Sequence, residues 1–479
     1  MSARQRWFAL VVLCGAQVMV ILDGTIVTVA LPAIQDGLRF SPTGLAWVLN
    51  AYLVGFGGLL PLAGRLGDLV GRRRVFTLGL LGFVATSLAC GLATDAAVLV
   101  VARFAQGVAG AFASAVVLGM LTTTFTDPRE RARAFGAFTF VGAGGASVGT
   151  LLGGVLTQGL GWHWIFLINV PIGLVAAALA MRALPAEPGL GVRSGADVPG
   201  ALLVTAGLML GVYTIVTVEQ HGPLATAGTG AVAVALLVAF VLRQRAAASP
   251  LVPLRIFRSR PVSGAIAVLL TMVAGLYGFQ FLTTLYLQQV RGYDAMRTGL
   301  AFLPVSLVIA ATSLLLSARL IARYGPRRVL LAGLVSIAAG LALFATVPLA
   351  AGYPTRILPA LVLVGLGFGI GMPALTGFAM SGAAPDDTGL VSGLFNTGQQ
   401  VGGALGLAVL ATVAATRTAA LRADGVALVP ARVAGHHLGY LVAAVLVAAG
   451  LALAFALLRT PGGADARREE TVTAAASTR

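Results

Sequence analysis

The stretch Gly64-Arg65-Leu66-Gly67-Asp68-Leu69-Val70-Gly71-Arg72-Arg73-Arg74 lies between two long apolar segments, residues 44–63 and 75–94. A membrane helix needs about 20 apolar residues to cross roughly 30 Å of hydrocarbon, and both flanking segments are long enough. The stretch between them is short, rich in arginine and glycine, and holds a single acid. It therefore predicts a polar turn that joins two membrane helices, and the same alternation recurs along the chain.

The composition is that of a polytopic membrane protein. Hydrophobic residues make up 58% of the chain, charged residues make up 10%, and the mean hydropathy is +0.95. Soluble domains carry about 25% charged residues, so this chain falls outside that class. Fourteen segments are apolar and long enough to cross a membrane: 8–32, 44–63, 75–94, 97–121, 134–157, 164–182, 199–218, 224–242, 262–287, 298–318, 329–349, 355–380, 394–415 and 438–458.

The distribution of arginine predicts the orientation. The net charge is +16, and all 32 basic residues are arginine. They recur in alternate loops and form no patch, so we expect no nucleic-acid partner. Of the 32, 24 fall on the side of the N-terminus, seven fall on the opposite side, and Arg103 lies within a span. Basic loops stay in the cytoplasm, so both termini are expected there, in the plasma membrane of a bacterium. Cys14 and Cys90 fall in predicted spans, so neither a disulfide nor a metal site is expected.

A weak internal repeat predicts the domain organisation. Residues 318–328 read Ala-Arg-Leu-Ile-Ala-Arg-Tyr-Gly-Pro-Arg-Arg and keep the arginine-to-glycine spacing of the opening stretch. Two six-helix halves place both loops equivalently, a plan known in transporters whose substrate site lies between the halves. The predicted units are an N-terminal bundle at 1–182, an inserted helix pair with a cytoplasmic linker at 183–261, a C-terminal bundle at 262–458, and a disordered cytoplasmic tail at 459–479.

Several motifs carry a family resemblance. Residues 64–73 match the G-x-L-x-D-x-x-G-R-R/K signature of the major facilitator superfamily. Further stretches resemble the fourteen-helix drug:proton antiporters of the EmrB/QacA type: 22–32, 103–107, 162–173, 286–304 and 396–403. The resemblance implies the major facilitator fold, an all-α polytopic membrane protein with two six-helix bundles plus two inserted helices.

The resemblance also implies a conformational role for one group of residues. The opening stretch would act as a conformational latch, in which an acid such as Asp68 meets a helix N-terminus of the other half, because such termini favour anions. The latch residues are Gly64, Asp68, Gly71, Arg72 and Arg73. For Arg73, positive-inside anchoring alone is a sufficient explanation.

The antiporter motif of the family departs from its pattern here. The family has G-P-x-x-G-G in the fifth helix, whereas this chain has Thr150 in place of the proline, between Gly149 and the pair Gly153 and Gly154. Threonine restores a backbone N–H that proline lacks, so a kink in this helix is expected to be softer. Small residues at this density also let helices pack closely in lipid.

Asp23 is the main candidate for chemistry. An ionisable group in hydrocarbon costs at least about 2.5–3.5 kcal/mol on insertion scales, so it needs a partner or a function. At 1.5 Å per residue, Asp23 lies roughly 24 Å from the inner edge of the segment 8–32, and Arg103 lies roughly 9 Å from the outer edge of the segment 97–121. The depths match, and Gln106 shares the face of Arg103. Either Asp23 and Arg103 neutralise each other as a buried pair, or Asp23 is the proton-coupling carboxylate.

Polar and aromatic side chains in the C-terminal half suggest a substrate cavity. Most aromatic residues in membrane helices serve packing, so this assignment is a hypothesis for each residue. The candidates are Tyr277, Phe279, Gln280, Thr283 and Tyr286 in the segment 262–287, with Asn396 and Gln400 in the segment 394–415.

These features together predict a transporter. We expect a monomeric, proton-coupled exporter of small hydrophobic or cationic compounds, such as drugs or secondary metabolites, which works by alternating access. It is expected to be no enzyme and to need no cofactor besides the proton. A proton-coupled importer of a small nutrient stays open as an alternative because of Thr150, and a non-transporting membrane sensor is a second alternative.

Overall fold

The structure is a computed structural model, and it describes residues 3–185, 189, 191, 195–218, 220–348, 352–382 and 387–458. Regular structure in these residues is helical throughout. The elements of the first part of the chain are α1 (Ala3–Leu38), η1 (Gly44–Ala46), α2 (Trp47–Val70), α3 (Arg72–Gly91), α4 (Ala96–Ala115), α5 (Val117–Thr124), α6 (Pro128–Gly159), α7 (Trp164–Leu167) and α8 (Asn169–Ala183).

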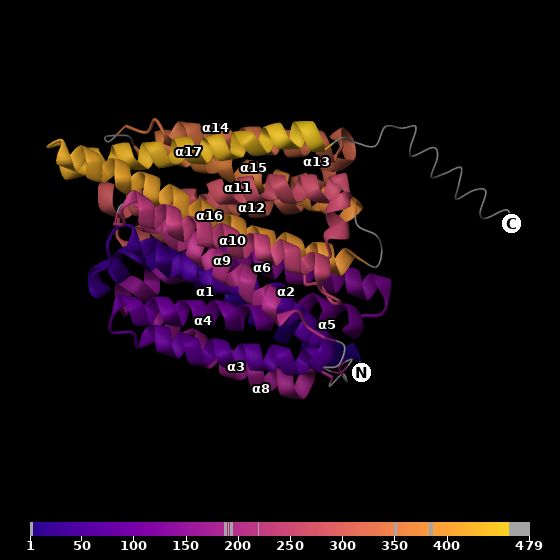
Figure 1. The fold of residues 1–479 in the computed structure, drawn as a ribbon. Coiled ribbons are helices and arrows are strands. Elements are labelled where there is room, and N and C mark those ends of the chain that lie inside the picture. The colour runs from indigo at the N-terminus through magenta and orange to yellow at the C-terminus, as the bar shows by residue number, and fades with distance from the viewer. Residues whose placement is uncertain are drawn as a thin grey trace.

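The elements of the second part of the chain are also helical (Figure 1). They are α9 (Val198–Val216), α10 (Pro223–Ala246), η3 (Leu254–Arg258), α11 (Arg260–Leu285), η4 (Tyr286–Val290), α12 (Ala295–Ala311), η5 (Thr312–Leu316), α13 (Ser317–Tyr324), α14 (Pro326–Phe344), η6 (Tyr353–Ile357), α15 (Leu358–Ser381), α16 (Thr388–Ala423) and α17 (Leu428–Leu457).

The predicted all-α fold with fourteen membrane-length helices is confirmed. Within the described residues, thirteen helical spans are long and apolar enough to cross a membrane. The 32-residue helix α6 covers the remaining predicted segment, 134–157. Consecutive elements combine into single spans, such as α4 with α5.

Two helix ends differ clearly from the predicted segments. Helix α16 continues to Ala423 instead of ending near 415, and α17 begins at Leu428 instead of 438. Residues 416–437 contain arginines and histidines, which lower the local hydropathy and so bound the apolar segments predicted from the sequence. A helix can continue into water as long as its backbone hydrogen bonds are kept, so the apolar length underestimates the helical length.

The helices fall into two groups that meet along a seam. Helices α1 to α8 pack mostly among themselves, as do α11 to α17. The seam is formed where α6 packs on α12 and α2 packs on α16, while α9 lies against both α2 and α16 (Figure 1). The unit boundaries at 182 and 261 stay predictions, and the predicted tail at 459–479 lies outside the described residues.

The start of α1 and the end of α17 lie at the same end of the bundle, as an even number of spans requires (Figure 1). We call the opposite end of the bundle the distal end. The side on which the cytoplasm lies follows from the arginine distribution and stays a prediction.

Candidate functional site

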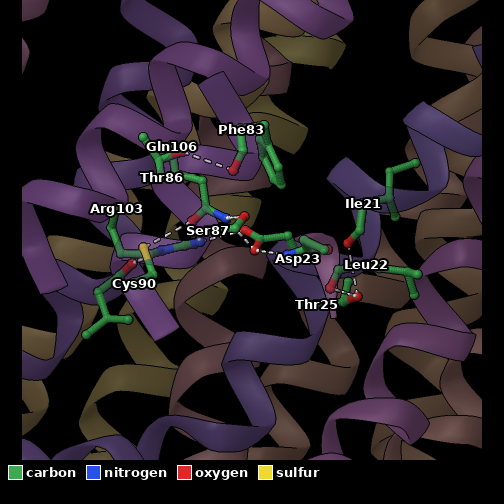
Figure 2. A network of polar contacts seen from close by, with 12 residues as sticks. Ile21, Leu22, Asp23, Thr25, Phe83, Thr86, Ser87, Cys90, Arg103 and Gln106 are labelled. Atoms are coloured by element: carbon green, nitrogen blue, oxygen red, sulfur yellow. Dashed lines mark hydrogen bonds and ion pairs between the residues drawn. The ribbon is translucent and has the colours of Figure 1, made fainter. Parts of the chain in front are cut away.

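A carboxylate on α1 is the centre of a buried polar network (Figure 2). Asp23 has no solvent-exposed surface. Its Oδ2 accepts a hydrogen bond from Arg103 Nη1 at 2.5 Å. Its Oδ1 accepts from Gln106 Nε2 at 2.8 Å and from Asn169 Nδ2 at 2.9 Å. Helices α4 and α8 therefore supply three donors to one carboxylate on α1.

The guanidinium of Arg103 is held from several sides. Its Nε donates to the carbonyl oxygen of Val48 at 2.9 Å, and its Nη1 also donates to Gln106 Oε1 at 2.6 Å. The Cζ atom lies 4.4 Å from the ring centre of Tyr52 and 5.6 Å from that of Phe166. Aromatic faces attract a guanidinium, most strongly where water is excluded. Arg103 is therefore fixed by its geometry as well as by its charge.

Gln106 uses all of its hydrogen-bonding capacity. Its Nε2 donates to Asp23 and also to Ser87 Oγ at 2.8 Å. Its Oε1 accepts from Arg103 and from the thiol of Cys90, whose sulfur lies 3.6 Å away. Because an amide has two donors and two acceptor lone pairs, every one of them is satisfied here. Gln106 thereby connects α3 to the ion pair between α1 and α4.

The energetics of such a pair favour a functional explanation over a stabilising one. Moving two charges out of water costs several kcal/mol per ion, and their attraction only offsets this where hydrogen bonding is complete. Replacing buried pairs with apolar residues is often neutral or stabilising, so the pair is weak evidence for stability. Hydrogen bonding to Asp23 is extensive here, since its two carboxyl oxygens accept from Arg103, Gln106 and Asn169.

The three residues matched by depth in the sequence are brought together. The network also includes three residues that were not predicted from the sequence: Asn169, Ser87 and Tyr52. For Asn169 a signal was available, because it lies five residues after Trp164, roughly 7.5 Å from the outer edge of its span, which is close to the depth of Arg103. Ser87 and Tyr52 carry no such signal, since hydroxyl and ring groups are common in membrane helices. The coupling role of the network stays a prediction.

The predicted latch is bonded within the N-terminal half in this conformation. Asp68 Oδ1 accepts from Arg72 Nε at 3.2 Å and from Arg72 Nη2 at 2.9 Å. Arg72 Nη1 donates to the carbonyl oxygen of Gly119, and Arg73 Nη2 donates to that of Met181. The contact of Asp68 with a helix of the other half stays a prediction.

Two glycines support the equivalence of the repeated loops. Gly71 has φ of +107°, and Gly325 has φ of +80°. Residues with a Cβ rarely adopt these values, so both turns require glycine. Gly64 has ordinary surroundings, with Ala115 as the nearest neighbour of an added Cβ.

The antiporter-motif helix makes backbone-close contacts on two sides. Gly149 and Gly153 of α6 face Thr25 and Ile26 of α1. On the other side, a Cβ added at Gly154 would lie 2.7 Å from the carbonyl oxygen of Ala295 in α12.

Thr150 lies at the same crossing of α6 and α12. A Cβ added at Gly299 of α12 would lie 2.6 Å from the carbonyl oxygen of Thr150. Helix α6 is continuous through Thr150, as expected for a residue that keeps its backbone N–H. The motif therefore lies where the two halves touch.

The predicted substrate residues of α11 divide between two faces. Tyr277 and Gln280 are half-buried, and Gln288, on the same face, reaches the N-terminal half. Phe279 instead packs on Phe344 and Tyr440, with ring centres 4.9 and 5.9 Å apart.

The other two predicted residues of this segment share the face of Phe279. Thr283 accepts a hydrogen bond from Tyr440, and Tyr286 packs beside His436. In this conformation the helical period turns Phe279, Thr283 and Tyr286 into the C-terminal bundle, almost opposite Tyr277, and their contact with substrate stays a prediction.

The remaining two predicted residues lie on α16. Gln400 lies where α16 crosses α2, and a Cβ added at Gly57 of α2 would be 2.8 Å from its Cβ. Its Oε1 is buried without a hydrogen-bond partner among the described residues. Asn396, one turn earlier, is exposed. Gln400 thus stays a candidate for substrate contact between the halves, and for Asn396 the role stays a prediction.

Comparison with known proteins gives the family. The model of the Major Facilitator Superfamily matches residues 13–407. The chain belongs to this superfamily. It is accordingly a multi-pass membrane protein of a transporter family. The EmrB/QacA subtype stays a prediction.

Similar proteins in the superfamily are known for resistance and export. The chain is 41% identical to the puromycin resistance protein of Streptomyces alboniger, with 95% of this chain and 90% of that protein covered. It is 39% identical to the cephamycin export protein of Amycolatopsis lactamdurans, with 90% and 87% covered. A solved structure of an auto-inhibited POT family peptide transporter aligns with a TM-score of 0.69 at 18% identity, covering 95% of this chain and 98% of that chain. The structural likeness shows the fold alone.

Proposed function

We propose that this protein exports a small hydrophobic or amphipathic compound of the antibiotic type in exchange for protons. The observation that carries the proposal is the fully buried ion pair of Asp23 and Arg103, held within the N-terminal half of a superfamily member. Relatives named for puromycin resistance and cephamycin export support the direction of transport. The protein works without catalysing a reaction, as a monomer, and the proton is its coupling ion.

Helix α1 connects the network to the seam between the halves. Gln288 Nε2 donates to the carbonyl oxygen of Val29 at 2.8 Å, and Gln289 Nε2 donates to Gln35 Oε1 at 2.9 Å. Val29 and Gln35 belong to the distal part of α1, beyond Asp23. We define the distal gate as these two contacts together with the close crossing of α6 and α12.

The proposed cycle depends on whether the helices around Asp23 offer hydrogen bonds to its ionised form or to its protonated form. In this conformation the distal gate is closed and the carboxylate is ionised with three donors. When the gate opens and α1 shifts, Asp23 loses donors and takes up a proton from the distal side, and substrate leaves. When α1 returns, Arg103 again favours the ionised form, and the proton leaves toward the cytoplasm. Proton entry supplies about 2.3 kcal/mol per charge per 100 mV, in addition to the pH gradient.

Everted membrane vesicles test the proposal. A pH gradient, acid inside, is formed and followed with a fluorescent amine, and puromycin is then added. The proposal predicts that puromycin dissipates the gradient in vesicles with the wild-type protein and has no effect with Asp23→Asn. Asp36→Asn is the matched control, because Asp36 is an exposed acid on the same helix. Dissipation by the Asp23→Asn variant would contradict the coupling role, and no response in the wild type would contradict puromycin export.

A further inference from the structure

A histidine in the C-terminal half lies outside the coupling network and is buried in its own polar cluster. His436 on α17 has 5% of its surface exposed. Its Nδ1 lies 2.6 Å from the carbonyl oxygen of Arg432, one turn earlier. A carbonyl only accepts, so Nδ1 carries the hydrogen and the neutral ring has its lone pair on Nε2. Within the described part of the chain, Nε2 has no hydrogen-bond partner.

The partner ring across from His436 also has an unused polar group. Tyr286 is 1% exposed, and its ring centre lies 6.0 Å from that of His436. The hydroxyl of Tyr286 has no partner among the described residues. Two buried polar atoms without hydrogen-bond partners on neighbouring rings are uncommon in folded proteins and ask for an explanation, such as a proton held in another state of the protein.

Tyr286 is the first residue of the π-helical segment that carries the distal gate. This segment, η4, runs from Tyr286 to Val290 and contains both Gln288 and Gln289. A π-helical turn is a local rearrangement of the backbone that often occurs at functional sites. Tyr286 and the two side chains that hold the N-terminal half therefore belong to the same five-residue segment.

The charges around His436 decide what a proton would do there. On α17 the neighbouring titratable groups are Arg432, His437 and Tyr440. The elements packed against this part of α17 contribute Tyr286 from η4, Arg291 just beyond it, and the exposed Arg417 of α16. All of these groups are cationic or neutral. A proton on Nε2 would thus create a buried charge without a compensating partner, and the closed arrangement would become unfavourable.

We propose that His436 is a second proton-accepting group, whose protonation from the distal side opens the distal gate through Tyr286 and η4. The inference rests on the proposed function, which gives the distal side its access to the more acidic compartment. The proton passes from water to Nε2 and returns when the gate closes. His436 acts on the gate, and Asp23 remains the group whose proton is coupled to transport.

Spin labels across the distal gate test this inference. Cysteines are introduced as Asp36→Cys and Arg297→Cys, which are exposed positions on α1 and α12, while native Cys14 and Cys90 are buried. The distance distribution is measured by pulsed electron resonance at about pH 7.5 and about pH 5, values on either side of the ordinary histidine range. We expect the fraction with the longer distance to rise about fivefold or more in the labelled wild type, a modest population shift.

Two histidine variants assign the effect. The labelled His436→Gln variant is expected to keep the short distance at both pH values. His437→Gln is the matched control, because His437 lies next in the chain but directs its Nε2 to the carbonyl oxygen of Val347, 2.9 Å away. It should respond as the wild type does. A pH response that persists in His436→Gln, or is absent from the wild type, would overturn the inference.

A third variant tests the gate without touching the histidine. Gln288→Ala removes the bond to Val29, so its distance distribution at neutral pH should resemble that of the wild type at low pH. A closed gate in this variant would overturn the link through η4. Puromycin export is measured separately in vesicles, so failure of the gate inference and failure of the proposed function give different results.

Discussion

Gln288 of the C-terminal half donates a 2.8 Å hydrogen bond to the backbone oxygen of Val29 in the N-terminal half. Val29 is six residues beyond Asp23 on α1, a rise of about 9 Å. The helix that carries the buried carboxylate therefore also carries an acceptor of the distal gate. A change in protonation that moves α1 reaches the seam between the halves without an intermediate element.

A neutral double variant separates the two explanations of the ion pair. Arg103→Gln alone leaves a buried carboxylate unpaired, which costs about 3–5 kcal/mol. Asp23→Asn with Arg103→Gln removes both charges and should recover most of that stability, measured as the thermal unfolding midpoint. Export by the double variant should stay below about one tenth of wild type, because a positioned proton-transfer group typically contributes a factor of about 10²–10⁴ to the rate. Wild-type export by the double variant would mean that the pair serves only to neutralise charge.

Asn169 is expected to support the ionised carboxylate. Hydrogen bonds to charged groups contribute about 1.5–3 kcal/mol. Asn169→Ala should therefore lower the unfolding midpoint and shift the pH dependence of export toward higher pH, since the ionised form loses a donor. Thr86→Ala is the control, because the Thr86 hydroxyl donates to carbonyl oxygens of its own helix. Equal pH profiles for Asn169→Ala and the wild type would remove Asn169 from the coupling network.

The crossing of α6 and α12 should tolerate no added methyl group. At Gly154 the nearest atoms to an added Cβ are backbone atoms of Ala295 and Met296, at 2.7 and 2.8 Å, so they have little freedom to move. Gly154→Ala is expected to hold the distal gate open and to reduce export. Gly159→Ala on the same helix has nothing within 4 Å and should be neutral, or stabilising by up to about 1 kcal/mol. Equal export by the two variants would contradict the role of this crossing.

The inserted pair α9 and α10 is tied together by Asp197 at the start of α9. Its Oδ1 accepts from Arg243 Nε at 2.9 Å, and its Oδ2 accepts from Gln244 Nε2 at 2.7 Å. The backbone N–H of Gly200 also donates to it, at 3.1 Å. Burial raises the pKa of Asp197, but these hydrogen bonds outweigh burial and hold the pKa below its ordinary value.

The stabilising effect of the Asp197 charge should depend on pH. A carboxyl with a lowered folded pKa contributes stability above its unfolded value of about 3.9, and the contribution is lost as the pH falls through the folded pKa. Asp197→Asn should therefore unfold at a lower temperature than the wild type near neutral pH, and the difference should shrink below about pH 4. A constant difference across that range would show that the charge of Asp197 does not stabilise the pair.

Much of this arrangement could be predicted because membranes constrain sequences strongly. The lengths of the apolar segments predicted the membrane spans. The matched depths of Asp23, Arg103 and Gln106 in the membrane predicted that these side chains meet. The helix ends of α16 and α17 could not be found in this way, because hydropathy detects the lipid boundary and helices continue beyond it.

Residue type alone does not indicate which face of a helix a side chain occupies. Phe279 and Tyr286 were grouped with Tyr277 by residue type, whereas the helical period turns them to the other face. The same period, applied from Tyr277 onward, would have separated them. The contact between Gln288 and Val29 depends on how two halves dock, and no local pattern encodes that.

Infrared difference spectroscopy tests the central claim, the protonation change of Asp23, most directly. Spectra of the purified protein in lipid are compared between neutral and acid pH, with puromycin present and absent. The account predicts a carbonyl band of a protonated, buried carboxyl group that appears in acid, is weakened when puromycin is added in acid, and is missing from Asp23→Asn. A spectrum of Asp23→Asn identical to that of the wild type under all conditions would contradict the claim.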